Sequence, residues 1–234
     1  MAPSSTHSAG SSTSSSSSGF RSGSSSHSSP FSTTPLPNRK PARAFAPSKF
    51  IAVGVQVVHF NPAVRLPMVA RVTLVDYKGF VVYDKFVRPT QPVCDYRTAQ
   101  TGLQPRDLAG APEFREVRFE VSMLLRDRII VGHSLWHFLS VMELSHPAID
   151  TRDTALFLPF RKSLKYKSHA VVPLNTLVLK LMNRQIGCNG EIAVEDARAA
   201  LDLYRSCEQT WEGIVKSGAW PCALPPAAYG NCFT

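Results

Sequence analysis

Phe-Ile-Ala-Val-Gly-Val-Gln-Val-Val is the sequence from residue 50 to residue 58. These apolar and β-branched residues predict the central strand of a sheet, and they form the first such run in the chain. Side chains alternate between the two faces of a strand, so Gly54 and Gln56 point to one face, where two ligands could stand two residues apart. Neither residue is a carboxylate.

Length and composition favour one globular domain of moderate size plus a tail. The chain has 234 residues, of which 44% are hydrophobic, and it contains no apolar run of the length that a membrane span requires. Its formal charge is +9, and the first acidic residue is Asp76. A basic amino-terminal half suits an anionic partner such as RNA, although basic surfaces also occur on proteins that bind no nucleic acid. No membrane partner is expected.

The cysteines are odd in number and scattered, without a spacing that would hold zinc. They indicate reduced thiols in an intracellular protein, and the sequence allows either the nucleus or the cytoplasm. The five are Cys94, Cys188, Cys207, Cys222 and Cys232.

Three segments are expected from the composition. Residues 1–48 are rich in Ser, with basic residues and few aliphatic ones, and should be a disordered tail. Within them the basic cluster at 38–43 is either a nuclear address or phosphate-contacting arm, or simply a solvated linker. Residues 49–216 should form the domain, and residues 217–234 a Pro- and Ala-rich tail that is extended.

The remaining sequence predicts an α/β domain with a mixed sheet. The first strand should continue into an antiparallel meander of three strands, with helices on the flanks. The expected strands after the first lie at 68–76, 79–87, 128–131 and 148–151, and the expected helices at 113–126, 135–144, 173–183 and 194–216.

A basic segment at 161–167 reads Arg-Lys-Ser-Leu-Lys-Tyr-Lys and suggests a mobile loop. Lysine and arginine next to an aromatic residue can follow a phosphate backbone and stack on a base, although a merely solvated loop has the same composition. The predicted nucleic-acid contacts are Arg97, Arg161, Lys162, Lys165, Tyr166 and Lys167.

Several further segments match one known family in the right order. They are Ala70-Arg71-Val72-Thr73, residues 82–90 (Val-Tyr-Asp-Lys-Phe-Val-Arg-Pro-Thr), Asp95-Tyr96-Arg97-Thr98, residues 130–135 (Ile-Val-Gly-His-Ser-Leu), Arg152-Asp153-Thr154 and residues 195–200 (Glu-Asp-Ala-Arg-Ala-Ala). On these segments, from Phe50 to about Trp211, the chain resembles the DEDDh-type 3′–5′ exonucleases, in particular the small RNA exonucleases related to ribosomal-RNA-processing and interferon-induced members. The resemblance implies an RNase H-like exonuclease fold.

The resemblance also implies a catalytic set of four acids and one histidine. In such enzymes the acids hold two divalent ions, Mg²⁺ or Mn²⁺, which activate water, and the histidine removes the proton of that water. Carried over, the first three acids fall on Gly54, Gln56 and Phe138, and the histidine falls on Glu191. Only the last acid is present, as Asp196.

These replacements predict that metal-dependent catalysis is lost. Asp196 alone is insufficient to hold two ions, so no cofactor is expected unless the site is rearranged. Glu191 could act as a base, but without a metal-bound water it has nothing to activate. Glu195 and Asp153 are the candidates for substitute ligands. His137 is a weaker candidate, because a histidine in such a position is more often structural, as His133 is expected to be.

Three functions follow from this pattern. The first is a catalytically inactive exonuclease homologue, a pseudoenzyme, that binds RNA or a protein as a regulatory module. The second is a working 3′–5′ RNA exonuclease, for RNA processing or degradation, with a rearranged Mg²⁺ or Mn²⁺ site. The third is a protein-interaction domain without a nucleic-acid role.

The vacated positions also predict a change in packing. Loss of a side chain at Gly54 opens space that the bulky ring of Phe138 can fill. We expect the ring to turn inward over Gly54 and Gln56 and to occupy the volume where metal and water would otherwise lie.

Overall fold

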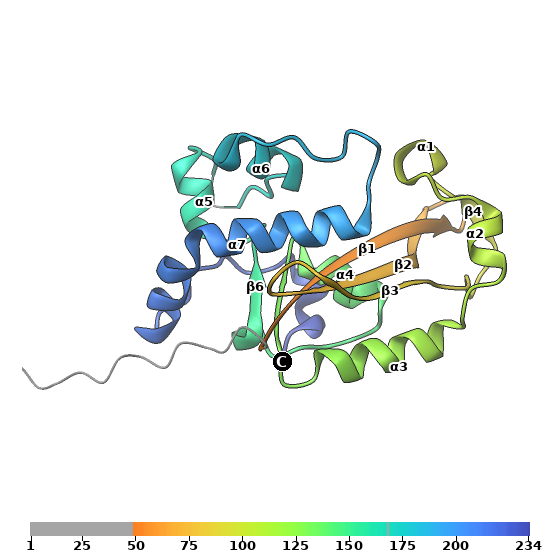
Figure 1. Cartoon of the computed structure of the whole chain (residues 1–234), viewed down its shortest axis with the longest axis horizontal. Helices are drawn as coiled ribbons and strands as arrows, with labels where there is room; N and C mark the ends of the chain where they lie inside the picture. The colour runs from red at the N-terminus through yellow and green to blue at the C-terminus, as the bar shows by residue number, and fades with distance from the viewer. Residues whose placement is uncertain (1–48, 168) are drawn as a thin grey trace, which may run out of the picture. The chain divides into compact units, whose positions relative to one another are not determined.

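The computed structural model describes residues 49–167 and 169–234 (Figure 1). Predictions for residues 1–48, including the disordered tail and the basic cluster at 38–43, lie outside the described residues. The elements follow in this order: β1 (Phe50–Phe60), β2 (Leu66–Asp76), β3 (Val81–Phe86), β4 (Val93–Asp95), α1 (Thr98–Thr101), α2 (Pro105–Ala109), α3 (Phe114–Leu125), β5 (Ile129–Gly132), α4 (Leu135–Val141), η2 (Ala148–Asp150), β6 (Thr151–Asp153), α5 (Leu158–Ser163), α6 (Leu174–Met182), α7 (Ala193–Lys216) and η3 (Ala227–Cys232).

The sheet is mixed, with β1 at its centre. Its strands lie in the order β3-β2-β1-β5-β6, and β4 pairs with the end of β1. β1 is antiparallel to β2, with Gly54 opposite Thr73, and parallel to β5, with Ala52 opposite Val131. β2 and β3 are also antiparallel. The predicted mixed sheet with a three-strand meander is confirmed, and β1 takes the centre because its apolar run is buried on both faces.

Helices cover both faces of this sheet (Figure 1). Phe50 and Ala52 belong to a hydrophobic cluster that contains residues of α6 and α7, whereas Ile51 and Val53 belong to a cluster with residues of α3 and α4. This alternation is the two-residue period of a strand. Gly54 and Gln56 continue the series of Phe50 and Ala52, so both face the side of the sheet that α7 covers.

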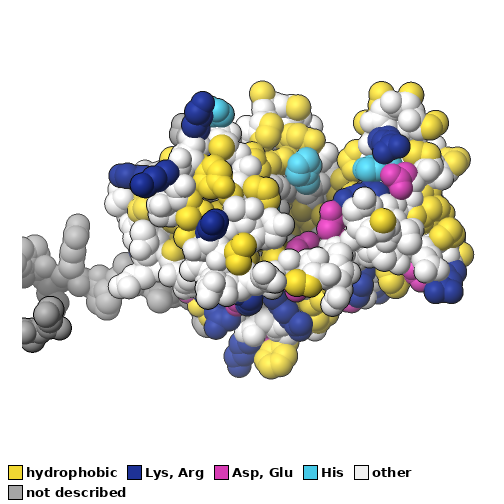
Figure 2. All heavy atoms as spheres, turned by 90° about the horizontal axis from the view of Figure 1, so that it is seen from above, with side chains coloured by type: hydrophobic (Ala, Val, Ile, Leu, Met, Phe, Trp, Pro, Cys, Tyr) yellow, Lys and Arg dark blue, Asp and Glu magenta, His cyan; other side chains and the backbone are white. Residues whose placement is uncertain are grey.

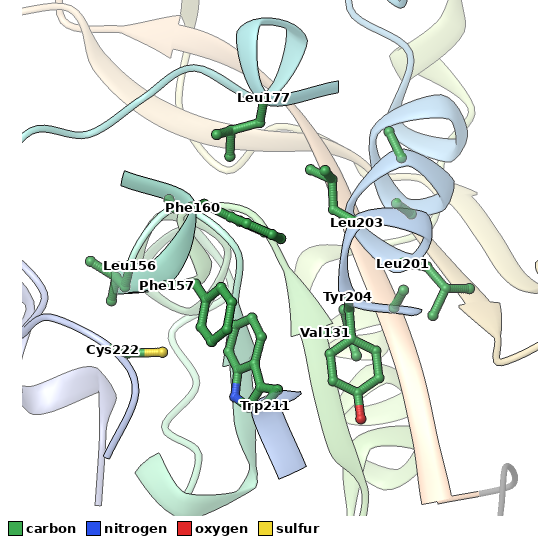
Figure 3. Packing of buried hydrophobic residues seen from close by; sticks show 14 of the residues in the cluster. Val131, Leu156, Phe157, Phe160, Leu177, Leu201, Leu203, Tyr204, Trp211 and Cys222 are labelled. Carbon is green, nitrogen blue, oxygen red and sulfur yellow. The ribbon is translucent and has the colours of Figure 1, made fainter. Parts of the chain in front are cut away.

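The core on the α7 side contains a group of packed aromatic rings among a larger number of aliphatic side chains (Figure 3). The rings of Phe157 and Trp211 stack with centroids 3.9 Å apart, and the Tyr204 ring meets Trp211 edge-on at 5.8 Å. Nε of Arg152 donates to Oε1 of Glu212 over 2.6 Å, and both side chains are buried. A buried ion pair tolerates little displacement of either partner, so it fixes α7 relative to β6.

The segment after α7 differs from the extended tail that its composition predicts. It contains η3, and Cys222 and Cys232 are buried. The amide of Ala223 donates to the carbonyl of Leu156 over 2.9 Å, and the amide of His146 donates to the carbonyl of Cys232 over 3.0 Å. Burial of apolar side chains, which the Pro and Ala content obscured, holds this segment on the domain.

Two local expectations need correction. Residues 148–150 form a 3₁₀ helix rather than a strand, and the strand β6 begins at Thr151. The basic segment at 161–167 is not entirely a loop, because α5 extends to Ser163. The helices expected at 113–126, 135–144, 173–183 and 194–216 are confirmed as α3, α4, α6 and α7.

The longest helix of the described residues is α7, with 24 residues. Charged side chains occur along its whole length. Neither α7 nor any other helix in the described part of the chain is both long and apolar enough to cross a membrane.

Candidate functional site

A pocket of about 490 Å³ opens beside the middle of β1. Seen from above, the molecule is hollowed between two raised parts, and acidic and histidine side chains lie in and around the hollow (Figure 2). The pocket is bordered by β1, α4, the first residues of α6 and the segment that leads into α7. Its lining residues are Val53, Gly54, Val55, Gln100, His133, Ser134, Leu135, His137, Phe138, Leu174, Asn175, Ile186, Gly187, Gly190, Glu191 and Asp196.

Gly54 lies where the first residue of α7 crosses β1. A Cβ added to Gly54 would lie within 3.0 Å of both the carbonyl oxygen and the carbonyl carbon of Ala193, a separation that real side chains essentially never adopt. The obstacle is backbone, which cannot rotate away as a flexible side chain can. Glycine is therefore the residue that lets α7 approach the strand this closely.

Gln56 is 2% exposed and joins the end of α1 to the segment before α7. Its Nε2 donates to the carbonyl of Thr101 over 3.0 Å and also to the carbonyl of Glu191. Its Oε1 is buried without a hydrogen-bond partner among the described residues. Both amide hydrogens are thus engaged, and the side chain holds the residues after β4 against the segment before α7.

Glu191 is held in the same junction. Its carboxylate accepts a hydrogen bond from Nη2 of Arg97 over 2.7 Å, and its amide donates to the carbonyl of Gln100 over 2.6 Å. Gly190 has a φ of +94°, and any Cβ there would meet the carbonyl of Gln100. Glu191 is therefore an ion-paired residue at the edge of the pocket, and Arg97 is its partner.

Asp196, from the first turn of α7, presents an unpartnered carboxylate to the pocket. Within the described residues this carboxylate forms no hydrogen bond or ion pair, whereas the carboxylate of the neighbouring Glu195 accepts from the amide of Gly187 over 2.9 Å. Burial, followed by the negative charges of Glu191 and Glu195, raises the pKa of Asp196 to about 7. The residue therefore exchanges a proton near neutral pH.

The prediction for the ring of Phe138 is confirmed only in part. The side chain is 3% exposed, so its expected burial is confirmed, but the ring packs with Val53 and Leu139 in the hydrophobic cluster of α3 and α4 and does not turn over Gly54 and Gln56, which face α7. The expected filling of the volume is wrong, because the pocket that Phe138 borders remains open beside Gly54 and Asp196. The ring packs into the core from α4 and forms a wall of the pocket.

Asp153, a candidate substitute ligand, lies apart from this pocket. Its buried carboxylate accepts from the amides of Ser134, Leu135 and Ala155 over 2.9, 2.7 and 2.9 Å. Burial, opposed by these hydrogen bonds, raises its pKa to about 6. Asp153 thus caps the start of α4, and its expected place among rescue ligands is wrong.

The two histidines of the pocket, His133 and His137, have different contacts. Nδ1 of His133 lies 3.0 Å from Oγ1 of Thr154, and burial lowers the pKa of His133 to about 4. His133 also lines the pocket and is held between β5 and the residues after β6, and its structural role stays a prediction. His137 lines the pocket, and its ring centroid lies 5.4 Å from that of Tyr229.

The residues of the pocket do not fit a pair of divalent ions. The described part of the chain contains no group of three or more His, Cys, Asp or Glu side chains that could hold a metal ion. In the pocket the carboxylates are those of Asp196 and Glu191, and Glu191 is already paired with Arg97. The backbone of Ala193 takes the space that an acid at position 54 would need.

The predicted basic segment is mostly at the surface. Lys162, Lys165, Tyr166 and Lys167 are exposed. Arg161 is 3% exposed, and its guanidinium donates to the carbonyl of Ala155 from both Nε and Nη2. The expectation that Arg161 contacts nucleic acid is corrected, because a buried guanidinium cannot reach a phosphate.

The sequence did not predict the pocket residues that lie opposite β1. Asn175 and Leu174 come from the start of α6, and Ile186 from the segment before α7. Nothing in their local pattern indicates a site. Ala193 was also missed, although a glycine inside an apolar strand is a recognised sign that another backbone comes close.

The comparisons with known proteins agree with this fold. Residues 52–204 match the family model described as exonuclease, RNase_T. The chain is 36% identical over 182 residues to RNA exonuclease 4 of Mycosarcoma maydis, which covers 78% of this chain and 48% of that protein. It is 35% identical over 199 residues to apoptosis-enhancing nuclease of Homo sapiens, which covers 84% and 61% respectively. The chain therefore spans about half to three fifths of the length of these relatives.

Solved structures give the same result at lower identity. The catalytic unit of Pan2 from Neurospora crassa aligns with a TM-score of 0.60 at 21% identity, over 77% of this chain and 29% of that one. The Pan2 module of Saccharomyces cerevisiae in complex with A7 RNA also gives 0.60 at 21%, over 73% and 30%. This likeness concerns the fold alone, and it confirms the expected RNase H-like exonuclease fold. Together with the match over residues 52–204, it leads to one assignment: the chain belongs to the exonuclease (RNase_T) family.

Proposed function

We propose that this exonuclease-family protein binds single-stranded RNA and does not cleave it by a two-metal reaction. The observation that carries the proposal is the contact between Gly54 and the backbone of Ala193. Two-metal cleavage needs carboxylates that clamp both ions beside the scissile phosphate. At position 54 an acid has no room, so the pocket lacks a ligand that the resemblance implies.

The other pocket residues support the same proposal. Gln56 uses both of its amide hydrogens in hydrogen bonds to backbone carbonyls. Glu191 stands at the position implied for a histidine base, and its carboxylate is ion-paired with Arg97. These groups stabilise the junction between loops. Asp196 remains as the carboxylate that is free to act, and one carboxylate is too few for two ions.

RNA is proposed as the partner on two grounds. Relatives carry the name RNA exonuclease, and one solved relative of the fold is a complex with RNA. The formal charge of +9 also favours an anionic partner. The compartment, nucleus or cytoplasm, stays a prediction.

Binding to RNA is expected to be independent of divalent metal. A fluorescein-labelled oligouridine RNA would be titrated with the full chain, followed by fluorescence anisotropy, in EDTA and in Mg²⁺. We expect the same Kd in both, and a log Kd that rises linearly with log salt by about 0.7 per phosphate contact. Loss of binding in EDTA would contradict the proposal.

An active RNA exonuclease is the second candidate. The names of the relatives favour it. The free carboxylate of Asp196 also favours it, because Glu195 in the first turn of α7 and Glu191 in the segment before α7 lie nearby. In this case Mg²⁺ or Mn²⁺ would bind at a rearranged site, and RNA would be shortened in the presence of metal. A domain that binds only protein is the third reading, and the absence of RNA binding in the titration would favour it.

A further inference from the structure

An acid-free stretch of the chain covers α5 and α6. Residues 154–190 contain neither Asp nor Glu, although the domain on either side contains both. The same stretch contains Arg161, Lys162, Lys165, Lys167, Lys180 and Arg184. In Figure 2, lysine and arginine side chains project from the part of the molecule where Figure 1 places α5.

The turn that ends α5 displays three lysines and one tyrosine. The amide of Tyr166 donates to the carbonyl of Arg161 over 2.8 Å, and Lys165 takes a left-handed φ of +60°. This turn leaves Lys162, Lys165 and Lys167 exposed, with Tyr166 43% exposed between them. No ion pair joins these three lysines to an acidic side chain of the described residues. Their charges are therefore available to an external anion.

A shallow hollow of about 560 Å³ lies beside these lysines. Its walls combine the apolar side chains of Leu158 and Pro159 with the ring of Tyr166, and Lys162 stands at its edge. Arg161 forms part of the wall and is fixed by its hydrogen bonds to Ala155, so this part of the hollow is rigid. A flat, apolar ring fits such a hollow, and an anion fits its rim.

We propose that this hollow receives one unstacked base of single-stranded RNA, with Lys162, Lys165 and Lys167 on the flanking phosphates. Base stacking on an aromatic ring and cationic contacts along the backbone are the two interactions by which proteins hold single strands without reading sequence. The inference rests on the proposed RNA binding and adds a second contact region to it. The acid-free stretch also supplies Leu174 and Asn175 to the main pocket, so it extends from one region to the other.

The test compares two variants that lose the same charge. Lys162→Ala, Lys165→Ala and Lys167→Ala are combined in one protein, and Lys78→Ala, Arg126→Ala and Lys216→Ala, all at exposed positions elsewhere, are combined in the control. With labelled oligouridine and the full chain, we expect the first variant to bind more weakly and its salt slope to fall by about 2, at about 0.7 per lost contact. The salt slope of the control variant should differ from that of the wild type by less than about 1, which is the effect of losing about one phosphate contact.

The base contact is tested separately. Tyr166→Ala should weaken binding by about tenfold, whereas Tyr166→Phe, which keeps the ring, should bind as the wild type does. Thermal unfolding checks that each variant remains folded. If the wild type binds RNA, equal salt slopes for the two triple variants, or equal affinities for Tyr166→Ala and Tyr166→Phe, would overturn the inference. If the wild type does not bind RNA, the proposed function fails as well.

Discussion

Gly54→Ala is expected to destabilise the protein by at least about 3 kcal/mol, although it adds a single methyl group. That methyl would lie within 3.0 Å of the Ala193 carbonyl, so α7 must move away from β1. The movement is resisted by the buried pair of Arg152 and Glu212 further along the same helix. For a domain of this size we expect the Tm to fall by about 6 to 12 °C, measured by thermal unfolding. Gly54→Asp, the change that would restore an acid, should cost at least as much.

The control for this prediction lies within α7 itself. A Cβ added to Gly213 meets nothing within 4 Å. Gly213→Ala should therefore stabilise the helix by about 0.5 to 1 kcal/mol, because alanine favours helix more than glycine does. If Gly54→Ala unfolds at the wild-type temperature or above it, the close approach of Ala193 is not a constraint and the argument against an acid at position 54 fails.

Asp196→Asn is expected to change stability with a definite dependence on pH. The pKa of Asp196 rises from its ordinary 3.8 to about 7 in the folded protein, through burial and then through Glu191 and Glu195. Between these two values the folded protein keeps a proton that the unfolded chain has lost. The stability that the protonated carboxyl contributes is thus complete below about pH 4 and is lost as the pH rises to about 7. A neutral asparagine has no such loss.

We therefore expect Asp196→Asn to match the wild type in stability near pH 4 and to exceed it at about pH 8, by on the order of 4 kcal/mol. Urea denaturation at a series of pH values measures the difference. Other buried groups, among them Asp153 and His133, also titrate in this range, and their effects cancel because both proteins carry them. Asp127→Asn, at an exposed aspartate, is the control and should follow the wild type. A constant difference from pH 4 to pH 8 would mean that Asp196 is ionised throughout.

Much of the fold could be predicted because the local sequence of most helices and strands indicates their type. β1 carries an apolar and β-branched run in which Gln56 is the polar side chain between Phe50 and Val58, and Pro173 is the N-cap of α6. The segment after α7 could not be predicted in this way. Its attachment depends on contacts of Cys222 and Cys232 with residues distant in the sequence, and no local periodicity encodes such contacts.

Part of the candidate site could likewise be predicted from the sequence, and part could not. The family resemblance assigned Gly54, Phe138, Glu191 and Asp196 to one site, and the structure places all four around one pocket. The sequence could not show that the Ala193 backbone fills the space at Gly54, since that depends on where α7 begins. It also gave no sign that Arg161 turns inward to Ala155 while the lysines beside it face outward. Side-chain direction at a helix end is decided by tertiary packing.

The most direct test of the central claim is an RNA degradation assay with the full chain. Single-stranded RNA labelled at its 5′ end would be incubated with Mg²⁺ or Mn²⁺ and with the wild type or Asp196→Ala, and the products separated by length. We expect no metal-dependent shortening of the RNA by either protein, under conditions in which the wild type binds the RNA. Stepwise shortening from the 3′ end by the wild type that disappears in Asp196→Ala would contradict it, because it would show that Asp196 supports metal-dependent cleavage.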